Sequence, residues 1–279
     1  MAAGSRQLYE LGDADRRLIR QSDLVLIATP DDSIQKVAGE LAILSKLTPQ
    51  ASGVTASIVL HTSGALTSEV LNPIRDAGFA TGSMHPLMSI SGQTNQSQPF
   101  SGIHFALEGD SAAIRLGRQL VRDLGGDSFV IDPRSKALYH AAAVMASPNL
   151  TALIDLAIEM MMHCGIASTK AHQILLPLIR STVGNLVTQD PQRALTGTFK
   201  RGDIDTVKLH LVALASERLT DAMAAYATLG KHSLTMSGIP KSKKQAIETL
   251  LAEATARSAA TVKLPTKRKP RASKSARRN

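Results

Sequence analysis

The chain has 279 residues, 43% of them hydrophobic, which is enough for one or two folded domains with largely aliphatic cores. The formal net charge of +9 does not mark the whole chain as nucleic-acid-binding, because nine basic and no acidic residues lie between Ala254 and the C-terminus. The sequence contains no run of 18 uncharged apolar residues, so we expect no membrane span. The single cysteine, Cys164, excludes an internal disulfide, and its apolar surroundings predict a buried thiol in a cytoplasmic protein.

Strand-like and helix-like segments alternate through the first half of the chain. The expected strands are Leu24–Ala28, Ser57–His61, Ala80–Met84, His104–Glu108 and Ser128–Ile131. The expected helices are Ser33–Leu44, Leu66–Ala77 and Ser111–Leu124. This βαβα alternation predicts an α/β fold with a parallel, Rossmann-type sheet that helices cover.

Strand signals end at residue 133, and the chain that follows is helical in pattern. The expected helices are Ser135–Ala146, Leu150–His163, Ser168–Val187, Asp203–Leu229 and Lys241–Ala254. Leu150–His163 is apolar on nearly all sides, so we expect it to be a buried central helix. Within Asp203–Leu229, the spacing of Val207, Leu211 and Leu214 predicts one core-facing stripe.

These patterns predict three regions. An α/β domain spans residues 1–133, and an all-α domain spans residues 134–255. Residues 256–279 form a basic tail that we expect to be disordered and to contact nucleic acid weakly and without specificity.

Polar residues follow the first three expected strands at the points where those strands end. The candidate cofactor-binding residues at these turns are Thr29, Pro30, Asp31, Ser63, Gly64 and His85. The carboxyl ends of parallel strands meet on one rim of a sheet, where ligands of open α/β folds bind. We therefore expect a cofactor site at this rim. The alternative is that each turn is an ordinary connection between a strand and a helix.

Lys136 and His140 are four residues apart, so they share one face of an expected helix. A lysine can bind a carboxylate or polarise a carbonyl group, and a histidine can transfer a proton near neutral pH. Both are therefore candidate catalytic residues. The alternative is a surface lysine beside a histidine with a structural hydrogen bond.

A second candidate group lies at Arg201, Asp203 and His210. Arg201 can anchor a carboxylate or phosphate through two hydrogen bonds. Asp203 and His210 lie on one polar side of the helix that follows. The alternative is that Arg201 and Asp203 simply pair with each other. We find no metal-ligand spacing and expect no metal site.

A resemblance to a known family rests on ordered segments of the chain: ATPDDSI, HTSGAL, HPL, EGD, KALYHAAAVMAS, LLPLIRSTVGN and ALTGTFKRGDIDTVKLHL. Together they resemble the Rossmann-like oxidoreductases that carry the helical domain of unknown function 2520. That family is similar to the wider group of 6-phosphogluconate dehydrogenase-like enzymes. The resemblance covers about Ser22 to Leu214, and its ALTG…RGD…TV…H segment is the most specific.

The resemblance implies NADP or NAD at the Rossmann rim, a small substrate between the domains and a homodimer formed by the helical half. The family begins with a strand and a GxGxxG turn, which bind the cofactor's pyrophosphate. Nothing before Ser22 resembles them, so we expect a sheet without its first βαβ unit and cofactor binding that is weakened or lost. A second departure is Pro148, which we expect to kink a helix.

The resemblance favours an NAD(P)-dependent oxidoreductase that acts on a small, carboxylate-bearing substrate in the interdomain cleft. The alternative is a non-catalytic binding or scaffold protein that has lost its cofactor. A start codon upstream of Met1 would account equally well for the absent glycine-rich turn.

Overall fold

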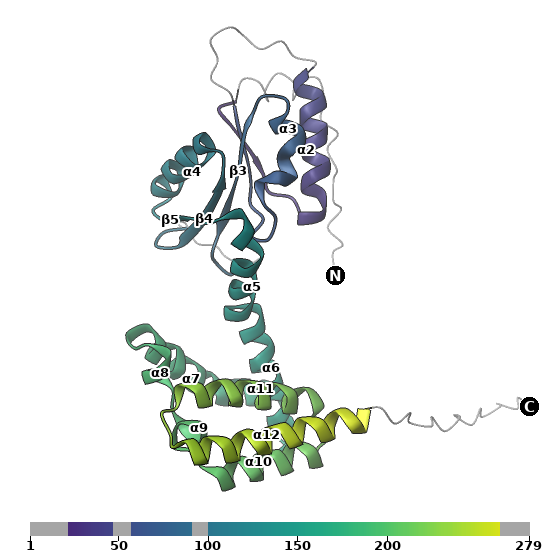
Figure 1. Ribbon diagram of the computed structural model, residues 1–279, viewed down its shortest axis with the longest axis vertical. Helices are drawn as coiled ribbons and strands as arrows, with labels where there is room; N and C mark the ends of the chain where they lie inside the picture. The colour runs from purple at the N-terminus through teal and green to yellow at the C-terminus, as the bar shows by residue number, and fades with distance from the viewer. Residues whose placement is uncertain (1–21, 47–56, 91–99, 263–279) are drawn as a thin grey trace, which may run out of the picture. The chain divides into compact units, whose positions relative to one another are not determined.

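The computed structural model describes residues 22–46, 57–90 and 100–262. These residues form two compact units that divide between Asn149 and Leu150 (Figure 1). The strands end before the domain boundary predicted at residue 133, but the next helix, α5 (Lys136–Ala146), groups with the sheet. Its first side chain, Lys136, is buried among residues of the sheet, which explains why the compact unit extends beyond the last strand.

The first unit is built on a five-stranded sheet. Its strands are β1 (Leu24–Ile27), β2 (Ile58–His61), β3 (Ala80–Pro86), β4 (His104–Gly109) and β5 (Asp127–Val130). They lie side by side in chain order, and three of the four pairings are parallel. The parallel register sets Ile27 opposite His61 and His61 opposite Ser83, so the carboxyl ends of β1, β2 and β3 meet at one rim. The predicted Rossmann-like α/β architecture is confirmed.

One pairing differs from the expected parallel sheet, since β4 runs antiparallel to β3. A parallel return would need a crossover, usually helical, whereas an antiparallel return needs none. The described parts of this connection, residues 87–90 and 100–103, contain no helix. The antiparallel register places Glu108 directly opposite Ser83.

Helices cover both faces of this sheet (Figure 1). One face packs against α2 (Asp31–Lys46), the 3₁₀ helix η1 (Ser68–Leu71) and α3 (Asn72–Arg75). The other face packs against α4 (Ser111–Asp123) through Phe105 and Val121. The single helix predicted over Leu66–Ala77 is replaced by η1 and α3. Pro73 lacks the N–H that a continuous helix would use, and it stands instead in the first turn of α3.

The second unit is helical. After α6 (Pro148–His163), it contains α7 (Ser168–Thr188), α8 (Pro191–Ala194), α9 (Gly197–Arg201), α10 (Ile204–Ser216), α11 (Thr220–Met236) and α12 (Lys241–Val262). Its core joins α10, α11 and α12. Val207, Leu211 and Leu214 are buried in that core, as their spacing predicts.

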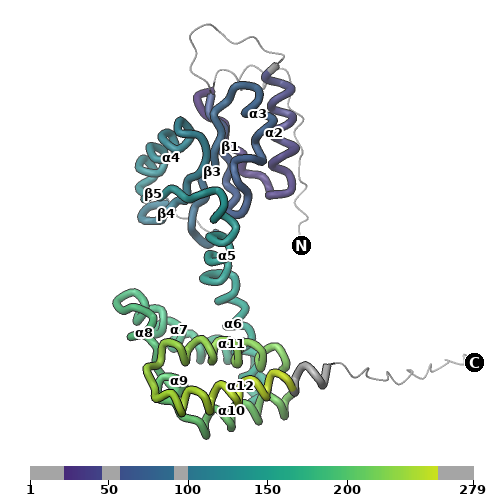
Figure 2. Tube along the Cα trace, in the orientation of Figure 1, coloured from purple at the N-terminus to yellow at the C-terminus, as the bar shows by residue number. Residues whose placement is uncertain are grey.

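The helix predicted over Asp203–Leu229 is two helices, α10 and α11 (Figure 2). The chain turns between them at Arg218, whose φ of 57° is left-handed and cannot continue a right-handed helix. A second break falls at Ser147, between α5 and α6. Pro148 begins α6, where its missing N–H costs no helical hydrogen bond, so it starts a helix instead of kinking one.

Three further expectations change. No residue of α6 is buried in the chain, so the predicted buried central helix is wrong. Cys164, just after α6, is exposed and not buried. Helix α12 continues to Val262, so the start of the predicted disordered tail is helical, and residues 263–279 lie outside the described part of the chain.

The α5–α6 segment is unusually apolar. Pro133–His163 is long and apolar enough to cross a membrane by length and composition, and its most apolar stretch of 18 residues is not buried inside the protein. Helices of soluble proteins can pass the same test, so length and composition alone do not establish a membrane span. The expectation of no membrane span rested on the absence of 18 consecutive uncharged apolar residues, and polar residues such as Asn149 and Asp155 interrupt this segment.

Candidate functional site

The rim of the first unit begins with a turn that Ser63 holds in place. Ser63 Oγ donates a hydrogen bond to Asp31 Oδ2 at 2.9 Å, which ties the turn after β2 to the first turn of α2. The same oxygen accepts hydrogen bonds from the backbone N–H groups of Ala65 and Leu66, at 3.2 and 3.0 Å. Two adjacent strand ends are thus joined by a short polar contact.

The side chain of His61 is fully buried and holds the backbone of this turn. Its Nδ1 accepts a hydrogen bond from the backbone N–H of Ser63 at 3.2 Å, and its Nε2 lies 3.3 Å from the carbonyl oxygen of Thr67. These partners require the proton on Nε2. Burial, and then the positive charge of Lys136, lower the pKa of His61 to about 4, so the ring is neutral at pH 7.

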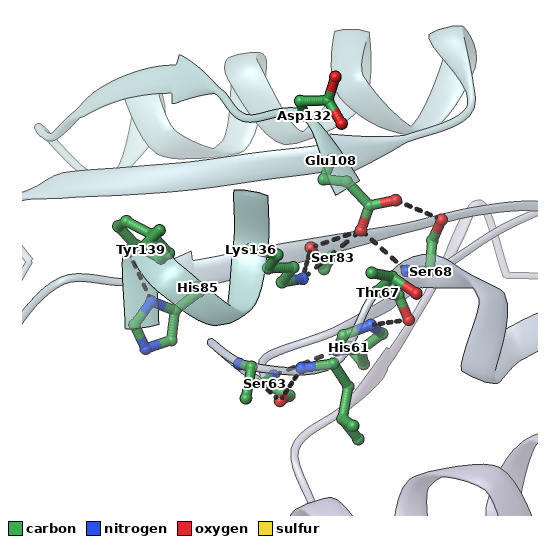
Figure 3. Close-up of polar contacts among 12 residues, drawn as sticks. His61, Ser63, Thr67, Ser68, Ser83, His85, Glu108, Asp132, Lys136 and Tyr139 are labelled. Carbon is green, nitrogen blue, oxygen red and sulfur yellow. Dashed lines mark hydrogen bonds and ion pairs between the residues drawn. The ribbon is translucent and has the colours of Figure 1, made fainter. Parts of the chain in front are cut away.

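A buried ion pair joins the sheet to α5 (Figure 3). Lys136 Nζ lies 3.5 Å from Glu108 Oε2 and also donates a hydrogen bond to Ser83 Oγ. The Glu108 carboxylate accepts further hydrogen bonds from Ser68, at 2.8 Å from the backbone N–H and 2.6 Å from the hydroxyl. Burial lowers the pKa of Lys136 to about 8, although the Glu108 carboxylate opposes that shift.

Two histidines and a tyrosine meet beside Gly64. His85 Nδ1 lies 2.8 Å from the hydroxyl of Tyr139, and the rings of His85 and His140 are perpendicular at 5.6 Å. A Cβ on Gly64 would lie 2.4 Å from His140 Nδ1 and 2.7 Å from His85 Nε2. Glycine is therefore required here by the close approach of both imidazoles.

The structure brings several of the predicted residues together in the first unit. Ser63, Gly64, His85, Lys136 and His140 all belong to this polar assembly, and Asp31 contacts it through Ser63. Thr29 and Pro30 are exposed at the adjoining turn. Lys136 is fully buried, and its ammonium group is already bound to Glu108 and Ser83 inside the protein.

The other predicted residues belong to the second unit. Arg201 pairs with Asp203: its Nη2 and Nε lie 2.7 and 2.8 Å from the same carboxylate oxygen. This pairing is the alternative that the sequence left open. His210 Nδ1 lies 2.8 Å from the hydroxyl of Tyr226. The predicted residues therefore form two groups, one in each unit.

The sequence prediction missed four residues of the first group: Ser68, Ser83, Glu108 and Tyr139. Glu108 carried a usable signal, because a charged residue inside an apolar strand needs a buried partner. Tyr139 directly precedes His140, but only the fold shows that its hydroxyl reaches His85.

The described rim fits only part of a dinucleotide cofactor. Hydroxyl and imidazole groups at Ser63, His85 and Tyr139 suit an uncharged ring with an amide or ribose hydroxyl groups. The N-terminus of α2 carries Asp31 and Asp32 in its first turn. Carboxylates there occupy the position at which a helix dipole would otherwise attract phosphate. Within the described residues, the rim therefore fits the nicotinamide end better than the pyrophosphate.

Comparisons with known proteins agree with this architecture. The profile of a Rossmann-like domain matches residues 9–86, and that of the domain of unknown function DUF2520 matches residues 103–233. No curated protein matches the chain.

Among solved structures, the fold is similar to protein TM1727 from Thermotoga maritima, with a TM-score of 0.54 and 24% identity over 84% of this chain and 79% of that one. It is also similar to a candidate NADP oxidoreductase, BF3122, from Bacteroides fragilis, with a TM-score of 0.54 and 17% identity over 84% of this chain and 76% of that one. At these identities the likeness concerns the fold. The chain therefore contains a Rossmann-like domain followed by the domain of unknown function 2520.

Proposed function

We propose that the protein is an NAD(P)-dependent oxidoreductase that acts on a small carbonyl or imine compound at the rim of its Rossmann-like unit. The observation that carries this proposal is the gathering of Ser63, Gly64, His85 and Tyr139 where the carboxyl ends of β2 and β3 meet the start of α5. Ligands of open α/β sheets bind at this end of the strands. The similarity in fold to a candidate NADP oxidoreductase supports the same activity.

Each group has a defined part in this proposal. A bound nicotinamide cofactor would supply or accept the electron pair. Ser63 and Asp31 would contact its ribose, His85 would face the reacting end, and the Lys136–Glu108 pair would hold α5 against the rim. Arg201 could anchor a substrate carboxylate only if that carboxylate displaced Asp203, so the proposal does not require a carboxylate on the substrate.

Isothermal titration calorimetry of the full chain with NADPH and with NADH tests the proposal. We expect saturable binding of at least one of them, and weaker binding of AMP, which lacks the nicotinamide half. A folded chain that binds neither dinucleotide would overturn the proposal.

A second candidate function is that of a non-catalytic binding or scaffold protein. The two carboxylates in the first turn of α2 favour it, because they disfavour phosphate at that helix terminus. A single sharp thermal transition without any dinucleotide binding would support this candidate over the oxidoreductase.

We also propose a homodimer in the cytoplasm, formed through the helical unit. Apolar side chains that the single chain leaves exposed on α6 and α7 support this assembly. The basic C-terminal tail is proposed to add only weak, salt-sensitive contact with nucleic acid.

A further inference from the structure

His85 uses one ring nitrogen inside the protein and leaves the other at the rim. Its Nδ1 lies 2.8 Å from the Tyr139 hydroxyl, and the two rings meet edge to face at a centroid distance of 5.7 Å. Its Nε2 makes no hydrogen bond within the described residues and lies on the side of Gly64. The free nitrogen therefore lies beside Gly64, in the turn that follows β2.

The direction of the hydrogen bond between Tyr139 and His85 follows from their chemistry. Burial, followed by His140 and Lys136, lowers the pKa of His85 to about 4, against an opposing effect of Asp31. Burial also raises the pKa of Tyr139. Both groups are neutral at pH 7, so a single hydrogen lies between them. A phenol is a good donor and an unprotonated imidazole nitrogen is a good acceptor, which favours donation from Tyr139 to Nδ1.

His140 supplies an independent argument for the same arrangement. Its Nδ1 is buried without a hydrogen-bond partner among the described residues, and it lies beside Gly64 on the same side as His85 Nε2. A buried N–H without an acceptor is costly, whereas a lone pair can rest against the Cα hydrogen of Gly64. With a lone pair on His140 Nδ1, a proton on His85 Nε2 avoids placing two lone pairs near each other.

We propose that Tyr139 is a positioning residue that holds His85 in the tautomer with its proton on Nε2, and that His85 offers this N–H to an uncharged carbonyl or imine acceptor beside Gly64. This inference rests on the proposed function for the identity of the ligand, but the tautomer follows from the protein alone. The acceptor is uncharged because the neighbouring cation, Lys136, already pairs with Glu108. An anion at this place would lose its hydration without gaining a free positive charge.

The same pair can move a proton without creating a charged histidine. As negative charge develops on the acceptor through the electron pair of a reduced nicotinamide, His85 Nε2 releases its proton to it. His85 Nδ1 takes the Tyr139 proton in the same event, so the ring stays neutral and the negative charge resides on the phenolate. Water then returns one proton to Tyr139 and leaves to the solvent as hydroxide, which balances the proton delivered to the acceptor.

Nitrogen-15 NMR of the histidines in the full chain tests the tautomer without any ligand. Near pH 7 we expect His85 to show a protonated Nε2 and an unprotonated Nδ1. Tyr139→Phe keeps the ring but removes the donor, so the His85 signals should shift toward a mixture of tautomers. Tyr226→Phe removes the hydroxyl at the His210 pair in the other unit and should leave His85 unchanged. A proton on Nδ1, or unchanged His85 signals in Tyr139→Phe, would overturn the inference.

Acetone and acetate test the class of acceptor, because they share a shape and differ in charge. In the presence of saturating NADP⁺, acetone should shift the His85 Nε2 signal and acetate should not. A larger shift with acetate, or no shift with either in a chain that binds NADP⁺, contradicts the assignment of an uncharged acceptor. If neither NADPH nor NADP⁺ binds while the tautomer is as expected, the proposed function fails and the positioning of His85 by Tyr139 stands.

Discussion

The ammonium group of Lys136 lies 3.5 Å from Oε2 of Glu108, and the two side chains are only 1% and 2% exposed. The same carboxylate receives two hydrogen bonds from Ser68, so one buried acid links η1, β4 and α5. This link fixes the start of α5, and with it Tyr139, against the carboxyl end of β3.

Breaking this pair should destabilise the first unit strongly. Lys136→Met leaves Glu108 buried without its cation, and losing one partner of a buried ion pair costs about 3–5 kcal/mol. Denaturant unfolding measures the loss, and the double variant Lys136→Met/Glu108→Gln should recover much of it because neither charge remains. The matched control is Lys36→Met, which breaks an exposed pair with Glu40 on α2 and should cost less than about 1 kcal/mol. Equal effects at the two positions would contradict the buried pair.

Acid should destabilise the protein through His61. Its pKa is about 4 in the folded chain and near 6.5 when unfolded, so between these values the unfolded state binds more protons. The free energy of unfolding should therefore fall as the pH is lowered from 6.5 to 4, by about 3 kcal/mol from this group alone. His61→Gln should flatten that slope, whereas His104→Gln, at an exposed position on β4, should leave it in place. An unchanged slope in His61→Gln would show that the ring does not titrate on unfolding.

Gly64→Ala should disturb the rim without unfolding the protein. The added methyl group would lie 2.4 Å from His140 Nδ1 and 2.7 Å from His85 Nε2, so the two rings must move apart. We expect NADPH affinity to fall about tenfold, or about 1.4 kcal/mol. Gly39→Ala, in the interior of α2 with open space around it, is the control and should raise stability by about 0.5–1 kcal/mol with unchanged affinity. Unchanged NADPH affinity in Gly64→Ala would show that NADPH does not bind at this rim.

Relief of backbone strain is expected at Arg218. Its φ of 57° lies in the left-handed region, which costs a non-glycine residue roughly 1–2 kcal/mol. Arg218→Gly should raise the free energy of unfolding by about 0.5 kcal/mol, since the greater freedom of glycine in the unfolded chain offsets part of the relief. Arg180→Gly, at an exposed position inside α7, should instead lower it by about 1 kcal/mol. Destabilisation by Arg218→Gly would show that contacts of the Arg218 side chain stabilise the turn by more than its backbone strain costs.

The rim could be predicted from sequence because local signals mark it. The first two strands are apolar runs, and polar or proline residues follow them, as at Pro30 and Ser63. The core stripe of α10 was equally local, since Val207 and Leu214 repeat at helical spacing. Patterns of this kind depend on neighbours in sequence, which is why they survive without a structure.

The remaining features depend on contacts that sequence spacing does not encode. The direction of β4 leaves no trace in its own residues, yet it sets Glu108 opposite Ser83. The turn at Arg218 contains no glycine or proline, so tertiary packing of α10 against α11 decides it. The sequence also does not show that carboxylates pair with Lys136 and Arg201, and only the folded structure reveals these ion pairs.

The apolar surface of α6 and α7 should close a dimer. In the single chain, Leu153 on α6 is 38% exposed, and Leu178 and Val187 on α7 are 64% and 79% exposed. Burial of such side chains stabilises by about 25 cal/mol per Å², and a stable interface buries on the order of 1,600 Å². Light scattering should therefore report twice the chain mass, and Leu178→Lys should shift the chain toward a monomer. Ile43→Lys, at a 64% exposed position on α2 in the other unit, should leave the mass unchanged. A clean monomer for the unmodified chain at micromolar concentration would exclude this interface.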